Sequence, residues 1–195
     1  AGEIADGARE ASHFGVNATF NSIDMSGVNS YKDGVITKLH KGLQGLVKSR
    51  NITYIEGHGK LVAKDTIEVS GARYTGKNIL LATGSYARTL PGLDIDGKRV
   101  ITSDQAMKME YVPKSVIVLG GGVIGCEFAS VWKSFGSEVT IIEGLPHLVA
   151  LEDESSSKQL ERAYRKRGIN FELGVRFKSH AVTADGVTVT LEDGK

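Results

Sequence analysis

The chain has 195 residues, and its 24 Lys and Arg against 23 Asp and Glu leave a formal charge of only +1. This balance argues against a nucleic-acid partner, because a nucleic-acid-binding domain normally carries a strong basic excess. No apolar run approaches the roughly 20 residues of a membrane-spanning helix, so we expect no membrane segment. One cysteine, Cys126, excludes an internal disulfide framework and a structural zinc site, and it favours a reducing, cytoplasmic compartment.

The first half of the chain predicts two helices. Residues 1–13 have the composition of a short helix, and residues 14–20 lead away from it as an extended segment. In residues 27–49, apolar side chains recur at steps of three and four, which is typical of one helical face. Ser26 is placed to cap the first turn of this second helix.

A change of period follows at Ile52. Four short β-rich segments within residues 52–76 are separated by glycine or Lys-Asp turns, which predicts an antiparallel meander. Residues 78–85 (NILLATGS) form a continuous apolar run ending in Thr-Gly, as expected of a buried strand. A connecting stretch, residues 85–112, should contain one short helix capped by Ser103.

The second half predicts alternating strands and helices. An apolar strand, a glycine turn, a helix ended by Gly136 and a second strand fill residues 115–143, the length of one β-α-β unit. A helix capped by Asp153 or Ser155 should follow and end at Gly168, before a third strand and a terminal hairpin. The sequence therefore predicts an α/β fold, Rossmann-like, three-layered, with a parallel sheet plus an antiparallel meander.

The most specific motif is the glycine turn Gly120-Gly121-Gly122-Val123-Ile124-Gly125, a G-x-G-x-x-G between a strand and a helix. In dinucleotide-binding folds, the first glycine makes the tight turn, the second lets backbone approach a pyrophosphate, and the third lets the helix pack closely on the strand. The free N–H groups and the positive end of the helix dipole would then face the phosphates.

Glu143 supplies the second half of this fingerprint, 23 residues after Gly120 and at the end of the second strand. Its carboxylate can accept hydrogen bonds from ribose hydroxyls, and it would repel a 2′-phosphate. The following residues, 144–153, contain no Arg or Lys, so we expect NAD rather than NADP. Glu127, in the first turn of the helix, has two interpretations: an acid that the helix dipole stabilises, or a residue near the cofactor. Cys126 is interpreted as a buried structural residue.

Together, residues 112–143, 54–69 and 78–85 resemble the FAD-dependent pyridine nucleotide-disulfide oxidoreductases, in that family's order of motifs. The resemblance implies a flavoenzyme that passes electrons from dihydrolipoamide through a cysteine pair and FAD to NAD. It also implies a homodimer and, as partner of the whole protein, a lipoyl-bearing 2-oxo acid dehydrogenase complex.

The resemblance assigns roles to individual residues. Thr83, Gly84 and Ser85 correspond to the second FAD-contact segment, and Gly59 to a backbone contact with the FAD adenine. Residues 120–125 and Glu143 correspond to the NAD site. Glu127 would approach the nicotinamide end, and Phe177 the NAD adenine.

The departures from the family pattern are equally specific. The redox-active Cys-x4-Cys pair, the first G-x-G-x-x-G and the catalytic His-Glu pair have no counterpart in this sequence. We therefore expect an internal fragment with two incomplete domains: residues 1–112 from the FAD-binding domain and residues 113–195 from the NAD-binding domain. The chain alone should be inactive. The alternatives are an NAD-binding redox-sensing module without catalysis and a related disulfide reductase of the mercuric or glutathione reductase type.

Overall fold

The computed structural model describes all residues, 1–195, and divides them into two compact units. The first unit combines residues 1–30 with residues 87–195, and the second contains residues 31–86. Each unit is described by itself below.

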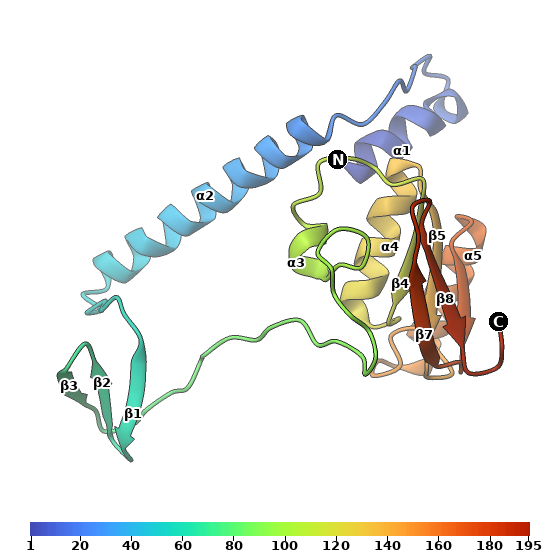
Figure 1. The fold of residues 1–195 in the computed structure, drawn as a ribbon. Helices are drawn as coiled ribbons and strands as arrows, with labels where there is room; N and C mark the ends of the chain where they lie inside the picture. Colours follow the sequence, from blue (N-terminus) through green and yellow to red (C-terminus); the bar gives the residue numbers. More distant parts are fainter. The chain divides into compact units, whose positions relative to one another are not determined.

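A parallel sheet forms the centre of the first unit (Figure 1). Its strands are β4 (Ser115–Leu119), β5 (Glu138–Glu143) and β6 (Asn170–Leu173), in the order β4-β5-β6. Helix α4 (Val123–Phe135) connects the first two strands, and helix α5 (Glu154–Lys166) connects the second pair. Both crossovers lead to the next strand in the same direction across the sheet, and because such crossovers are right-handed, both helices lie on the same face of the sheet. The predicted β-α-β unit and third strand are confirmed.

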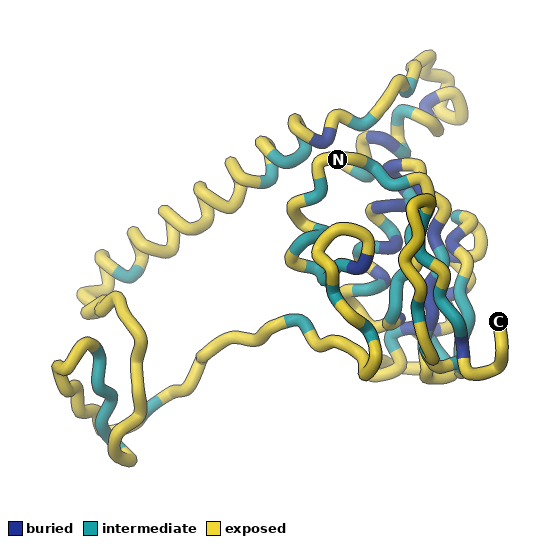
Figure 2. The backbone as a smooth tube through the Cα atoms, in the orientation of Figure 1, coloured by how far each residue is buried: buried dark blue, intermediate teal, exposed yellow.

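Apolar residues of these elements pack into one core. Trp132 and Phe135 of α4 meet edge to face, with ring centroids 5.9 Å apart. The Tyr164 hydroxyl on α5 donates a hydrogen bond of 2.7 Å to the Cys126 carbonyl on α4, joining the two helices. Figure 2 shows that the buried residues gather on α4, β5 and α5. The largest fully buried apolar side chains are Ile141, Leu148, Ile169 and Val139.

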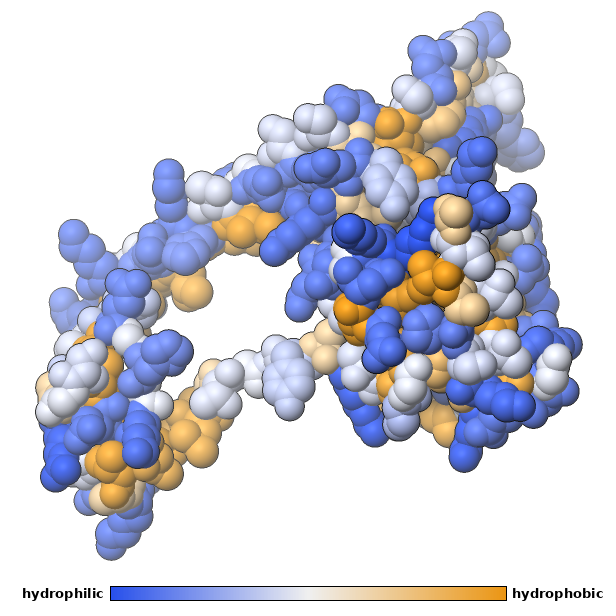
Figure 3. Space-filling model, in the orientation of Figure 1, coloured by the Kyte–Doolittle hydropathy of each residue, from blue (hydrophilic) through white to orange (hydrophobic).

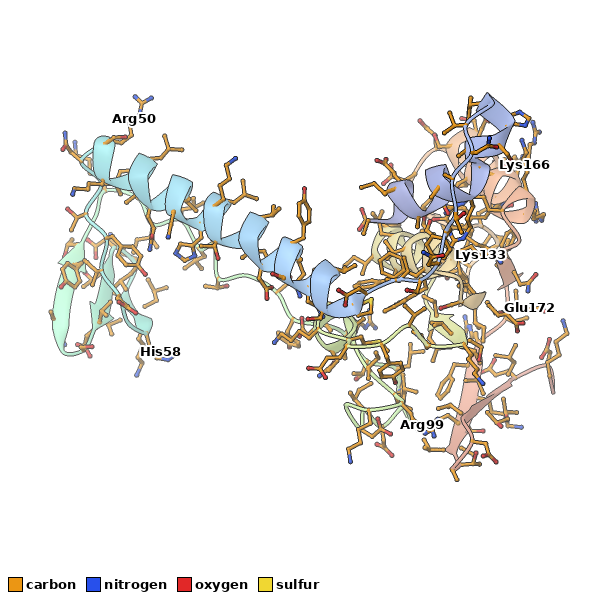
Figure 4. The ribbon with its side chains drawn as sticks, turned by 90° about the horizontal axis from the view of Figure 1, so that it is seen from above. Arg50, His58, Arg99, Lys133, Lys166 and Glu172 are labelled. Atoms are coloured by element: carbon orange, nitrogen blue, oxygen red, sulfur yellow. The ribbon has the colours of Figure 1, made fainter.

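A hairpin of β7 (Phe177–Val182) and β8 (Val187–Leu191) completes the layers of this unit. In Figure 1 the hairpin lies in front of β5 and α5 lies behind it, so the parallel sheet has helices on one side and the hairpin on the other. Arg99 donates a hydrogen bond to the Ala184 carbonyl in the hairpin turn; Figure 4 labels this arginine. The three-layered α/β fold is therefore confirmed.

Helix α1 (Gly2–Glu10), followed by the short 3-10 helix η1 (Ala11–Phe14), packs against α4. Asp6 accepts hydrogen bonds from Ser134 Oγ (2.5 Å) and from Arg167 (3.3 Å). Arg9 donates to the Ser134 carbonyl at 2.6 Å. These polar contacts fix the first helix on the outer side of α4.

The second unit contains a small antiparallel sheet of β1 (Gly59–Ala63), β2 (Thr66–Val69) and β3 (Ala72–Thr75). Three of the four predicted meander strands are confirmed. The prediction for residues 52–57 is wrong, because those residues pair with no strand.

The predicted buried strand at residues 78–85 is also wrong. No strand of the chain pairs with these residues, and Leu80 and Leu81 are 89% and 66% exposed. An apolar run becomes a buried strand only when neighbouring strands satisfy its backbone hydrogen bonds. Without such neighbours the segment remains irregular.

Helix α2 (Met25–Ser49) presents an unusual surface. Its large apolar residues face solvent, and Figure 3 shows orange side chains along it. The exposed set comprises Tyr31, Val35, Ile36, Leu39, Leu43 and Leu46. No helix of the chain combines the length and apolar content needed to cross a membrane.

Two of the predicted helix caps move by one or two residues. Asp24, not Ser26, caps α2, since its carboxylate accepts from the Ser26 N–H at 3.0 Å. Thr102, not Ser103, caps the short helix α3 (Ser103–Ala106) in a capping box with Gln105. The capping side chain lies two residues before the expected position in α2 and one residue before it in α3, and in both helices its oxygen accepts from a free N–H of the first turn. Asp153 is the N-cap residue of α5, although its side chain makes no cap hydrogen bond.

Candidate functional site

The glycine turn stands where β4 ends and α4 begins. Gly120 has φ of +114°, a conformation that a residue with a side chain rarely adopts, and its N–H donates to the Ile142 carbonyl at 2.8 Å. Gly122 is the N-cap residue of α4 without a side-chain cap, and the first hydrogen bond of the helix runs from the Cys126 N–H to the Gly122 carbonyl. The N–H groups of Val123, Ile124 and Gly125 therefore have no acceptor within the helix.

The glycines of the turn differ in how much space a side chain would have. A Cβ on Gly125 would lie 1.9 Å from the Gly120 carbonyl oxygen and 3.2 Å from Val118 Cγ1 on β4. A Cβ on Gly122 would have no atom within 4 Å. Gly125 is thus a glycine because strand and helix approach closely, whereas the space in front of Gly122 is open.

Glu143, at the end of β5, binds the turn directly. Its Oε2 accepts a hydrogen bond of 2.6 Å from the Gly121 N–H, and its Oε1 accepts one of 2.8 Å from the Leu145 N–H. The structure therefore brings the predicted carboxylate and the glycine turn together at the carboxyl ends of two parallel strands. In doubly wound folds, ligands bind in the crevice at this edge.

Arg176 was missed by the sequence reasoning. It follows β6 and packs against Gly144, with its Cγ 3.7 Å from where a Cβ on Gly144 would stand. Its guanidinium is an exposed positive charge on the same edge of the sheet as Glu143. Reading the ends of all three strands together, rather than only residues 144–153, would have found it.

Cys126 lies directly behind the turn and is 4% exposed. Its thiol donates to the Gly121 carbonyl at 3.3 Å. Burial, together with the charge of Glu143, raises the pKa of the thiol to about 11. The thiolate is the reactive form, so this cysteine is chemically inert near neutral pH, as its interpretation as a structural residue requires.

The other residues predicted for the NAD site lie at separate places. Glu127 is exposed on α4, one turn after Gly122–Val123, and its side chain makes no hydrogen bond or ion pair. Phe177 is half-buried at the start of β7, where it pairs with Leu191 and lies 6.2 Å, centroid to centroid, from the His180 ring.

The residues predicted to contact FAD are not assembled into a site. Gly59 opens β1, whereas Thr83, Gly84 and Ser85 lie in the irregular segment after β3, and all four are exposed. Gly84 has φ of +79°, a turn conformation consistent with the expected Thr-Gly bend. No hydrogen bond or packing contact joins the two places, so the described residues do not form a cradle for FAD.

A cleft of about 900 Å³ borders the glycine turn on the β4 side. Gly120, Gly122 and Gly125 line one end of it, and residues of the β7–β8 hairpin line another part. His180 Nδ1, in the same lining, is a buried nitrogen without a hydrogen-bond partner. No group of three or more His, Cys, Asp or Glu side chains is arranged to hold a metal ion.

Comparison with known proteins gives this geometry a context. The family model for pyridine nucleotide-disulphide oxidoreductases matches residues 3–195. The chain belongs to this family. Enzymes of the family use FAD and a nicotinamide dinucleotide.

Individual relatives agree. The chain is 37% identical over 183 residues to the mitochondrial dihydrolipoyl dehydrogenase of Pisum sativum, a match that covers 91% of this chain and 36% of the pea protein. It is 37% identical over 204 residues to the dihydrolipoyl dehydrogenase of Bacillus subtilis, covering 98% of this chain and 42% of that one. The chain thus spans well under half the length of these relatives.

The fold matches as well. The crystal structure of LpdA from Mycobacterium tuberculosis superposes with a TM-score of 0.83 at 25% identity. The match covers 100% of this chain and 44% of LpdA.

Proposed function

We propose that the chain is the nucleotide-binding centre of a dihydrolipoyl dehydrogenase, a flavoprotein that oxidises dihydrolipoamide with NAD through a redox disulfide and FAD. The observation that carries the proposal is the glycine turn: the space in front of Gly122 is open, the N–H groups at the start of α4 are free, and Glu143 stands beside them. The matched relatives named dihydrolipoyl dehydrogenase supply the reaction.

The residues of the turn fit a dinucleotide. The N–H groups of Val123 and Ile124 would bind the pyrophosphate, favoured by the helix dipole, and Gly122 would let it approach the backbone. The Glu143 carboxylate would accept hydrogen bonds from the adenosine ribose. When bound, the nicotinamide supplies a hydride acceptor; Glu127 would lie toward that end and Phe177 toward the adenine.

The assignment of NAD rather than NADP rests on the charge of Glu143. A 2′-phosphate beside this carboxylate would be repelled, and the repulsion opposes the attraction of Arg176. A preference for NADH over NADPH is therefore expected.

The FAD contacts of Gly59 and of Thr83 to Ser85 belong to the same proposal. Since these residues are exposed and apart, we propose that the chain by itself retains no FAD. Oxidation of a dithiol through an enzyme disulfide needs two protein sulfurs, and the chain has one inert thiol, so it should not turn over dihydrolipoamide alone.

The domain assignment and the partners are also proposals. We assign residues 1–112 to an FAD-binding part and residues 113–195 to an NAD-binding part. The whole protein would act as a homodimer within a lipoyl-bearing 2-oxo acid dehydrogenase complex. Cytoplasmic location stays a prediction, since one relative is mitochondrial and another is bacterial.

Titration of the purified chain with NADH, followed by nucleotide fluorescence, tests the proposal. We expect saturable binding that is weaker for NADPH. Gly122→Ala should abolish binding, because its methyl group would fill the open space where the pyrophosphate must approach. Unchanged NADH affinity in this variant would contradict the assignment of the turn.

The alternatives predict different results. A related disulfide reductase of the mercuric or glutathione reductase type would prefer NADPH. A redox-sensing module without catalysis would also bind NADH. If that alternative holds, a longer protein that contains both this chain and a Cys-x4-Cys segment of the family would show no dihydrolipoamide oxidation.

A further inference from the structure

A buried carboxylate on α5 has no role in the site described so far. Glu161 is 6% exposed, and burying a charged group is costly unless hydrogen bonds compensate. Its ion pair with Arg165 is long, 3.8 Å, and Arg165 is largely exposed, so this pair adds little. The stronger contacts of Glu161 are with the loop that follows β5.

That loop, residues 144–152, receives two contacts from one oxygen of Glu161. Glu161 Oε1 accepts a hydrogen bond of 3.2 Å from the Leu148 N–H and lies 3.2 Å from His147 Nδ1. Leu148 itself is fully buried. The carboxylate therefore pins the middle of the 144–152 loop to α5.

The next residue of the loop contacts the glycine turn. The Val149 N–H donates to the Gly121 carbonyl at 2.7 Å, and Leu148 Cδ2 lies 2.7 Å from where a Cβ on Gly121 would stand. Gly121 is thus held from both sides, by Glu143 at its N–H and by Val149 at its carbonyl.

Val149 adopts an unfavourable conformation to make this contact. Its φ is +45°, a region that β-branched residues avoid, and such strain persists only where the surroundings impose it. The Val149 carbonyl accepts from the Glu152 N–H at 2.8 Å and from Ser157 Oγ at 3.4 Å. The hydrogen bond from Leu148 to Glu161 fixes the preceding residue.

We infer that Glu161 is a positioning residue for the dinucleotide site, acting through Leu148 and Val149 on Gly121. It touches neither the turn nor the space in front of it. By holding the 144–152 loop against α5, it keeps Val149 in the strained conformation that orients the Gly121 peptide. The inference rests on the proposed binding of NAD at the turn.

Variants of the full chain test this role by NADH titration. Glu161→Ala should weaken binding roughly tenfold, because a buried charge-assisted hydrogen bond is lost and the loop is released. Glu161→Gln keeps an oxygen for the Leu148 N–H and should restore most of the affinity. The matched control is Glu154→Ala: Glu154 is on the same helix and lies 3.9 Å from His147 Nε2, but it has no bond to the loop backbone, so affinity should not change.

A second measurement does not depend on how a variant folds. If the loop positions the turn, NADH bound at the turn must in return stabilise the loop. Hydrogen exchange of the Leu148 and Val149 amides in the wild-type chain should slow when NADH saturates the turn.

The outcomes separate the two proposals. Failure of the wild-type chain to bind NADH would refute the proposed function. NADH binding with unchanged affinity in a folded Glu161→Ala variant would overturn the role of Glu161 alone. Exchange at Leu148 and Val149 that is indifferent to bound NADH would overturn it as well.

Discussion

Gly125→Ala offers the sharpest test of the strand-to-helix packing in the turn. The new Cβ would stand 1.9 Å from the Gly120 carbonyl oxygen and 3.1 Å from its carbon. Both neighbours are backbone atoms, so relief requires β4 and α4 to separate by about 1.5 Å, which a close-packed interior resists. The cost should therefore reach or exceed about 3 kcal/mol, the upper end for overpacked sites.

For a chain of this size, about 3 kcal/mol corresponds to a fall in Tm of roughly 6 to 12 °C. Thermal unfolding followed by far-UV circular dichroism measures it. Gly122→Ala is the control: its Cβ meets no atom within 4 Å and its φ of −71° suits any residue, so its Tm should stay within about 2 °C of wild type. A Gly125→Ala variant as stable as this control would refute the argument from close packing.

Three further predictions concern the groups around the turn. Glu143→Gln should weaken NADH binding and reduce the preference for NADH over NADPH, measured as the ratio of their affinities in competition titrations. The reason is that the repulsion of a 2′-phosphate disappears while the positive charge of Arg176 remains; an unchanged affinity ratio would contradict this. Cys126 should resist thiol reagents in the native chain at pH 8 and react on unfolding in urea, since burial raises its pKa to about 11; rapid native labelling would contradict its burial. Burial, with a smaller contribution from Cys126, raises the pKa of Tyr164 to about 12. The Tyr164 hydroxyl and the Cys126 thiol therefore lose their protons at lower pH in the unfolded chain than in the folded chain. Their contribution to the free energy of unfolding is fully present below about pH 9 and is lost as the pH rises toward 12. Tyr164→Phe should cost about 1 kcal/mol at pH 8 through loss of the bond to the Cys126 carbonyl, and should make urea midpoints less dependent on alkaline pH than in wild type.

The β-α-β unit could be predicted because its signals are local. Gly120, Gly125 and Gly136 stand where the backbone turns or approaches closely, and the apolar runs between them have the lengths of a strand and a helix. The spacing to Glu143 then follows from the length of the unit, which is why the carboxylate and the turn meet as expected.

Residues 78–85 show where such reasoning fails. Their apolar pattern is the same whether or not neighbouring strands exist, and pairing is a property of distant parts of a chain rather than of the pattern itself. The predicted FAD contacts of Thr83 to Ser85 depend on that pairing.

The contacts of Glu161 could not be predicted for a different reason. Glu161 is 40 residues from Gly121 in sequence, and it acts through Val149, whose positive φ contradicts the preference of a β-branched residue. No local pattern marks a carboxylate on a helix as buried, so only the three-dimensional arrangement reveals its place.

Because α1 docks on α4, the N-terminal part of the chain should stay bound even after the backbone is cut. The exposed irregular segment at residues 78–85 should be an accessible site for a protease. A single cut there would leave an N-terminal piece still bound through Asp6 and Arg9 to Ser134 and Arg167, with Met25 in the common core. The two pieces should therefore elute together and separate only in denaturant, and two separately produced fragments should re-form the contact between α1 and α4.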